Sequence, residues 1–115
     1  MIADGQIVLF RFPQTDQTTG KLRPALVLRR LPGQYDDWLI CMVSSRLEQG
    51  IADFDETITQ GDPDFKESGL KVPSLIRISR LAVVSGNILI GKLGQVDEVR
   101  LLRIKQNLSR WIQSA

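Results

Sequence analysis

Short apolar runs separated by turn residues fill the first 95 positions of the chain. Runs rich in β-branched and aromatic residues predict strands over 6–12, 24–30, 37–43, 74–80 and 87–94, with a shorter strand around 54–58. The run at 37–43 is apolar on both faces, which predicts a central strand. Between the runs, Pro, Gly, Asp and Thr predict a loop over 13–22 and a turn over 31–34.

The last twenty residues follow a helical pattern instead. Apolar residues recur at helical spacing from Leu101 onward, with the arginines largely off this stripe, and Asp97 is placed to cap the first turn. This pattern predicts a helix over about 97–113 that covers a barrel over about 5–94. No repeat or low-complexity tract divides the chain, so we expect one domain over 1–115. A mainly β chain with one C-terminal helix indicates a small antiparallel barrel of the SH3-like type.

The chain shows no sign of membrane association or secretion. Its longest apolar runs fall far short of the roughly 20 residues that span a bilayer. Asp4 and Gly5 interrupt the start, where a signal peptide would have its apolar core. Cys41 is the single cysteine, so an internal disulfide is excluded and a reducing compartment is expected. We therefore expect a cytoplasmic protein.

Charge is unevenly distributed. Six of the 13 acidic residues stand in 53–67 against Lys66, a net charge of −5 in a chain of net +2, which leaves +7 for the rest. A basic body permits an anionic partner, although an ordinary solvated surface accounts for the same charges. The acidic segment has no EF-hand spacing, and we expect it to be a charged surface loop.

The chain has no histidine, which excludes imidazole chemistry. Apart from Cys41, only carboxylates remain as possible zinc ligands. We expect no metal and no cofactor.

Two segments carry candidate binding residues. In the first, Lys21, Arg23 and Pro24 stand where a polar loop meets an apolar strand. Proline restricts the preceding residue to extended conformations, so Arg23 should project at a defined angle and suit a phosphate. A solvent-facing cation that protects an edge strand is the alternative. In the second, Ser44 and the residues after it follow the central strand, where hydroxyl and N–H groups can bind an anion or simply cap a turn.

The order of four segments along the chain is informative about the protein family. They are "DGQIVLFRFPQTD…GKLRPALVL", "LICMVSSR", "SGLKVPSLIRISRLAVV" and "ILIGKLGQVDEV". This order resembles that of the MazF/PemK family of toxins over nearly the whole chain. The resemblance implies an SH3-like barrel, usually a homodimer, that cuts single-stranded RNA without a metal. It also implies an antitoxin protein that neutralises the toxin, and operator DNA bound by the toxin–antitoxin complex.

The resemblance also assigns roles to residues. Arg23 matches the family's catalytic arginine, and Ser44 falls at the position of the family's threonine, so both are implied to be catalytic. The substrate-binding residues implied are Lys21, Ser45, Arg46, Arg77 and Arg80. In such an enzyme the ribose 2′-OH attacks its own phosphate, so the protein supplies orientation and charge stabilisation rather than a nucleophile.

Two departures from the family pattern leave alternatives open. Serine replaces threonine at Ser44, which removes the methyl group that fixes the rotamer, and the glutamate common before the Arg-Pro pair is missing. A catalytically silent module that binds RNA, DNA or a peptide on the same barrel is one alternative. A purely structural role is the other, and it predicts no salt-dependent RNA binding.

Overall fold

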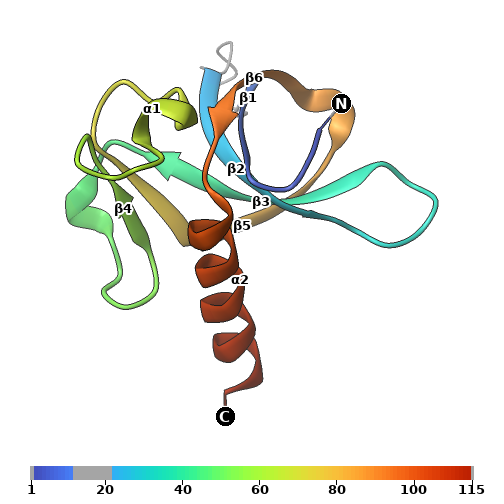
Figure 1. Ribbon diagram of the computed structural model, residues 1–115. Helices are drawn as coiled ribbons and strands as arrows, with labels where there is room; N and C mark the ends of the chain where they lie inside the picture. Colours follow the sequence, from blue (N-terminus) through green and yellow to red (C-terminus); the bar gives the residue numbers. More distant parts are fainter. Residues whose placement is uncertain (1, 12–21, 115) are drawn as a thin grey trace, which may run out of the picture.

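The computed structural model describes residues 2–11 and 22–114 (Figure 1). The strands are β1 (Gln6–Arg11), β2 (Leu22–Arg30), β3 (Asp37–Ser44), β4 (Glu56–Ile58), β5 (Ser74–Ser85) and β6 (Leu89–Gln95). The helices are α1 (Phe65–Ser68) and α2 (Glu98–Gln113), with short 3₁₀ turns η1 (Leu47–Gln49) and η2 (Gly86–Ile88). Each run predicted as a strand overlaps one, and the C-terminal helix is confirmed.

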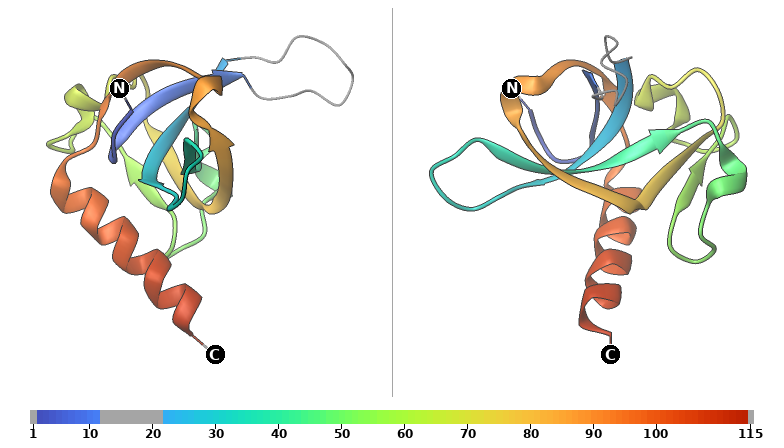
Figure 2. Two further views of the ribbon diagram at one scale, coloured as in Figure 1. Left: turned by 90° about the vertical axis from the view of Figure 1, so that its right-hand side faces the viewer. Right: turned by 180° about the vertical axis from the view of Figure 1, so that it is seen from behind.

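The strands form one antiparallel sheet in the order β4-β5-β3-β2-β1-β6. The sheet is strongly curved, and α2 crosses one side of it (Figure 1, Figure 2). The predicted fold class, a small β-barrel with a C-terminal helix, is confirmed. The strand β3 lies between β2 and β5, which confirms the central position predicted for it.

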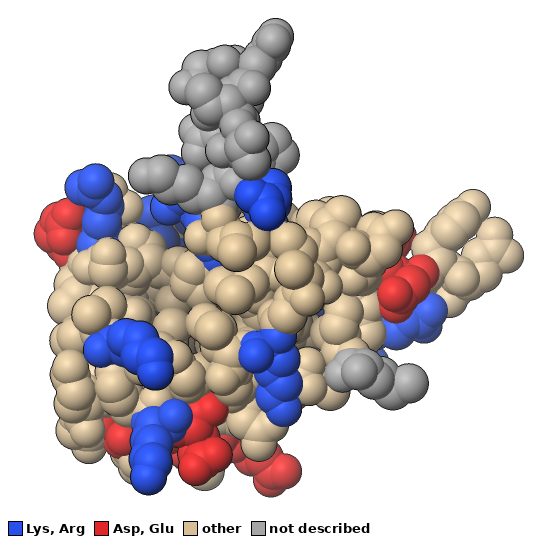
Figure 3. All heavy atoms as spheres, turned by 90° about the horizontal axis from the view of Figure 1, so that it is seen from above, with Lys and Arg blue, Asp and Glu red and all other residues tan. Residues whose placement is uncertain are grey.

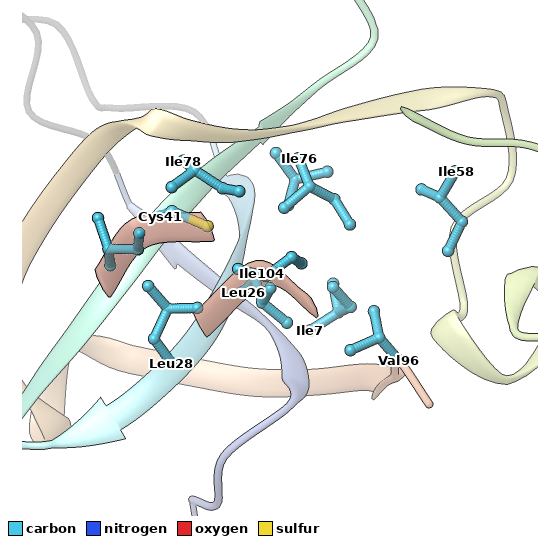
Figure 4. Close-up of a cluster of buried hydrophobic side chains, with 11 residues drawn as sticks. Ile7, Leu26, Leu28, Cys41, Ile58, Ile76, Ile78, Val96 and Ile104 are labelled. Carbon is cyan, nitrogen blue, oxygen red and sulfur yellow. The ribbon is translucent and has the colours of Figure 1, made fainter. Parts of the chain in front are cut away.

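Two apolar clusters cover the two faces of the sheet. Alternate residues of β2 divide between them, as the two-residue period of a strand requires: Leu26 and Leu28 join one cluster, and Ala25 and Val27 the other. The first cluster also receives Ile104 of α2, which lies among the strand side chains in Figure 4. Burial of α2 on this face follows from its apolar stripe.

A bulge bends β5. The ladder with β3 pairs Cys41 with Leu81 but Met42 with Arg77, so three residues of β5 have no partner position on β3. The side chain of Asp55 holds this bulge, accepting hydrogen bonds from the N–H and the Oγ of Ser79 at 2.9 Å each. The bulge resets the alternation of apolar residues, which explains why the sequence pattern predicted a strand only to 80 while β5 continues to Ser85.

The short helix α1 closes the barrel against β6 through backbone contacts. Gly69 follows α1 with φ of +75°, a conformation that favours glycine, and a Cβ atom there would overlap the Leu93 carbonyl group. A Cβ atom on Gly94 would overlap the Glu67 carbonyl oxygen and the Ser68 backbone. Two glycines therefore let the two backbones meet directly. The sequence pattern did not predict α1, which is a single turn.

A buried arginine joins α2 to the acidic segment. Arg100 is 5% exposed, and its Nε and Nη2 donate to the Asp64 carboxylate at 2.8 and 3.2 Å. Its Nη1 donates to Glu56 at 2.9 Å and to the Thr57 carbonyl at 3.0 Å. Asp64 is itself 3% exposed. Two expectations are thus wrong: Arg100 lies inside rather than off the helix stripe, and the acidic segment is in part buried.

Asp64 is held as a carboxylate by its partners. Burial alone would raise the pKa of Asp64, but the hydrogen bonds from Arg100 and from the Asp97 N–H, together with the charge of Arg100, lower it below its usual value. The Asp97 carboxylate accepts from the Arg100 N–H, which confirms Asp97 as the N-cap. The start of α2 is therefore fixed by the same residues that order the acidic segment.

We expect Arg100→Met to lower the free energy of unfolding by about 3–5 kcal/mol, because it leaves the Asp64 carboxylate buried without its partner. The matched control is Arg103→Met. Arg103 also pairs with Glu56, but its side chain is 50% exposed, so the loss should be about 1 kcal/mol or less. Urea unfolding followed by circular dichroism measures both values, and equal losses would contradict a special role for the buried pair.

We expect Gly94→Ala to destabilise the protein by about 2 kcal/mol or more, because the new methyl group pushes β6 away from α1. Gly91→Ala is the control in the same strand, since nothing lies within 4 Å of a Cβ at that position. It should change stability by less than about 1 kcal/mol. Thermal unfolding distinguishes the two. Similar melting temperatures for both variants would show that the barrel does not depend on this contact.

Candidate active site

The strands β2 and β3 separate near Pro24. Their ladder ends at the pair Ala25–Met42, and the next residue, Pro24, lacks the N–H that a longer ladder would use. Beyond this point β2 continues beside β1 as far as Leu22, two residues before the predicted start of the strand, and β3 continues beside β5 as far as Ser44. The ends of two adjacent strands therefore diverge.

A cavity of about 250 Å³ lies where the strands diverge. Its lining residues come from three walls: the start of β2, the end of β3 with the residues after it, and the segment between α1 and β5. They are Leu22, Arg23, Pro24, Val43, Ser44, Ser45, Arg46, Leu70, Lys71, Val72 and Ser74. Four of the seven residues selected from the sequence thus line one cavity: Arg23, Ser44, Ser45 and Arg46.

Arg23 and Ser44 lie on the same face of the sheet. Ala25 and Met42 are paired and both pack on the second apolar cluster. Arg23 lies two residues before Ala25 on β2, and Ser44 lies two residues after Met42 on β3. Because side chains alternate along a strand, both lie on that face as well. Arg23 is exposed and Ser44 is half-buried. A ligand in the cavity can therefore meet both side chains from one side.

The hydroxyl of Ser44 has a fixed position. Its Oγ accepts a hydrogen bond from the N–H of Arg46 at 3.0 Å. A hydroxyl that accepts one bond still has its proton to donate. The backbone thus holds the Ser44 oxygen in one position, as the methyl group of a threonine would by fixing the rotamer.

The cavity is electropositive. Arg23, Arg46 and Lys71 line it, and none of the described residues that line it is acidic. At the end of the molecule that is uppermost in Figure 1, Lys and Arg side chains are spread over the surface and acidic side chains lie toward its edges (Figure 3). Three cations without a carboxylate in a small hollow suit an anion such as a phosphodiester.

The other predicted residues are placed differently. Lys21 lies outside the described residues. Arg77, on β5, is paired with Met42 of β3, and its Nη1 donates a hydrogen bond to the side chain of Gln49 at 2.9 Å. It does not line the cavity. Arg80 is exposed in the bulge of β5 and does not line the cavity either.

The third wall was missed by the sequence analysis. Leu70, Lys71, Val72 and Ser74 follow a stretch of weak pattern, and no periodicity there indicated which side chains face the strands. The only available signal was their place in the segment "SGLKVPSLIRISRLAVV", in which only the two arginines have a predicted role.

Three further observations concern chemistry elsewhere in the chain. Burial raises the pKa of the Cys41 thiol, so this cysteine is kept protonated in the core. Among residues 2–11 and 22–114, no group of three or more His, Cys, Asp or Glu side chains is arranged to hold a metal ion. No helix in the same part of the chain is long and apolar enough to cross a membrane.

Comparison with known proteins gives matches of two kinds. A model of the family described as "PemK-like, MazF-like toxin of type II toxin-antitoxin system" matches residues 3–112. The solved structure of the Mycobacterium tuberculosis toxin MazF-mt6 is similar with a TM-score of 0.68 and 15% identity, over 96% of this chain and 98% of that one. An endoribonuclease in complex with its cognate antitoxin, from a mycobacterial species, is similar with a TM-score of 0.66 and 11% identity, over 100% and 98%. None of the curated proteins compared matches the chain.

Proposed function

The chain belongs to the PemK-like, MazF-like toxins of type II toxin–antitoxin systems, and from this premise we propose that it is an endoribonuclease that cuts single-stranded RNA without a metal ion. The observation that carries the proposal is the cavity lined by Arg23, Ser44 and Arg46, with no acidic side chain among its described lining residues. The similar mycobacterial structure, itself an endoribonuclease, is consistent with it. The RNA substrate would be met in the cytoplasm.

The proposed reaction is a transfer within the RNA. The 2′-oxygen of the ribose gives up its proton and forms a bond to the adjacent phosphorus. The bond from phosphorus to the 5′-oxygen breaks and that oxygen takes up a proton, which leaves a 2′,3′-cyclic phosphate and a 5′-hydroxyl. Negative charge builds on the nonbridging oxygens, where the guanidinium of Arg23 and the O–H of Ser44 donate hydrogen bonds. A guanidinium stays protonated in proteins, so Arg23 stabilises charge rather than accepting a proton.

Ser45, Arg46 and Lys21 would hold the phosphates and riboses on either side. Ser45 and Arg46 line the same cavity as Arg23. Arg77 and Arg80 lie outside the cavity, so they would bind more distant phosphates of an RNA strand that follows β5. Contacts of this kind bind RNA through charge and depend on salt concentration.

A catalytically silent binding module is the second candidate. The missing glutamate before Arg23 and the serine at position 44 favour it. The Arg46 N–H that holds the Ser44 hydroxyl favours the enzyme, since it restores the orientation that threonine would provide. The binding module would hold RNA, DNA or a peptide, and where the ligand is RNA the two candidates differ in whether the bound RNA is cut.

We expect Arg23→Ala to reduce the rate of RNA cleavage about 10²- to 10³-fold, the usual loss when one donor to a developing charge is removed. Arg29→Ala is the matched control, because Arg29 is an exposed arginine of the same strand outside the cavity, and its rate should be unchanged. A fluorophore–quencher RNA in EDTA reports the rate, and mass spectrometry identifies the cyclic phosphate.

The outcomes separate the candidates. Equal cleavage by wild type and Arg23→Ala would remove Arg23 from the mechanism. A folded wild type that binds RNA in a salt-dependent manner without cutting it would establish the binding module. Growth arrest on induced expression, relieved by a small protein encoded beside this chain, would support the toxin and its antitoxin, which with the toxin would bind operator DNA.

We further propose a homodimer formed through a partly apolar hollow beside α2. This hollow, about 730 Å³, lies between α2 and the bulge of β5. Trp111 is 59% exposed at its rim, with its ring 5.7 Å from that of Phe54, and Leu81 and Ile51 are exposed beside it. Exposed aromatic and aliphatic side chains around a hollow are typical of an interface.

Trp111→Arg should therefore convert the dimer to a monomer of 12.9 kDa. The control is Val99→Arg, which changes another exposed apolar side chain of α2, 71% exposed, outside the hollow. Size-exclusion chromatography with light scattering gives the mass of each protein. A wild type at the mass of one chain would contradict the dimer, and a dimeric Trp111→Arg would place the interface elsewhere.

A further inference from the structure

We propose that the third wall of the cavity selects the base beside the cleaved phosphate, and that Lys71 favours a base with a carbonyl oxygen at C4 of a pyrimidine or C6 of a purine, namely uracil or guanine. This inference rests on the proposed function, because it takes RNA to be the ligand. It concerns residues 70–74, which the sequence analysis did not identify.

The size and walls of the cavity fit one base. Its volume of about 250 Å³ lies below the roughly 300–1,000 Å³ of pockets for drug-sized ligands. Leu22 on the β2 wall is 47% exposed and Val72 on the third wall is 51% exposed. Exposed aliphatic side chains beside three cations suit a ligand with apolar faces and an anionic backbone, as an unstacked nucleotide has.

The third wall is held in place by its neighbours. Before it, the Oγ of Ser68 accepts from the Leu70 N–H at 3.2 Å, and Gly69 lies against the backbone of β6. After it, the Oγ of Ser74 donates to the Val72 carbonyl at 2.9 Å. Lys71 therefore projects from a short backbone segment fixed at both ends. A donor with a fixed origin can discriminate between bases rather than only attract charge.

The chemistry of Lys71 sets the preference. An ammonium group has three donors and no acceptor. It can bond to O4 of uracil or to O6 and N7 of guanine, whereas cytosine presents an amino group at the equivalent edge and adenine presents one beside N7. None of the described residues lining the cavity is acidic, so none of them offers a carboxylate to accept from such an amino group.

The test uses RNA that cannot be cut. Four fluorescent 2′-O-methyl heptamers, of uridine, cytidine, inosine and adenosine, lack the free 2′-OH that cleavage needs. Uridine and cytidine differ at the edge that Lys71 would contact, and inosine offers the O6 and N7 of guanine in place of the amino group of adenosine. Fluorescence anisotropy at one fixed salt concentration gives the dissociation constants.

We expect wild type to bind the uridine heptamer about tenfold more tightly than the cytidine heptamer, and inosine more tightly than adenosine. Lys71→Met should abolish the preference. Lys66→Met removes an exposed lysine of α1 outside the cavity and should retain it. Both positions are exposed, and thermal unfolding verifies that the variants are folded.

The remaining outcomes are equally decisive. Equal affinities for uridine and cytidine in wild type, or a preference that persists in Lys71→Met, would overturn the inference. A preference for uridine without one for inosine would support the contact and restrict it to uracil. Because these heptamers report binding alone, a base preference in a protein that leaves ordinary RNA intact would retain this inference and remove the proposed nuclease.

Discussion

The ion pair between Arg100 and Asp64 is the interaction on which the rest of this structure depends. Both side chains are almost fully buried, which carries a large cost in lost hydration. That cost is offset because the guanidinium donates to two carboxylates and to the Thr57 carbonyl, and because Asp64 also accepts from the Asp97 N–H. The contact joins the first turn of α2 to a segment more than thirty residues earlier, which carries six of the 13 acidic residues of the chain.

The position of this pair links it to the cavity. Asp64 immediately precedes α1, the two glycines seat α1 on β6, and the third wall of the cavity begins at Leu70. The helix α2 is therefore not only a cover for the apolar cluster. It fixes the start of the segment from which Lys71 projects. The divergence of β2 and β3 fixes Arg23 and Ser44 on the other two walls of the cavity.

Local signals in the sequence were sufficient for the strands, the position of β3 and the Asp97 cap, because alternation and capping depend on neighbouring residues. The role of Arg100 was not predictable in this way. An arginine in a surface helix is expected to be exposed, and only the three-dimensional structure shows that its carboxylate partners are buried beside it. The wall formed by residues 70–74 was missed for a related reason, because its backbone is held by contacts with β6 and by serine hydroxyls rather than by a periodic pattern. Arg23 and Ser44 were each predicted separately as site residues. Only the pairing of Ala25 with Met42 shows that they lie on the same face of the sheet.

The seat of α1 on β6 also affects how this chain behaves among other chains. A sheet in this strand order has two edges, β4 and β6, and an uncovered edge is a template on which a foreign strand can add by hydrogen bonding. The backbone of α1 lies against β6 at Gly94, and β4 offers only three residues. The short length of β4 and the packing of α1 on β6 therefore leave a foreign strand less backbone on which to add.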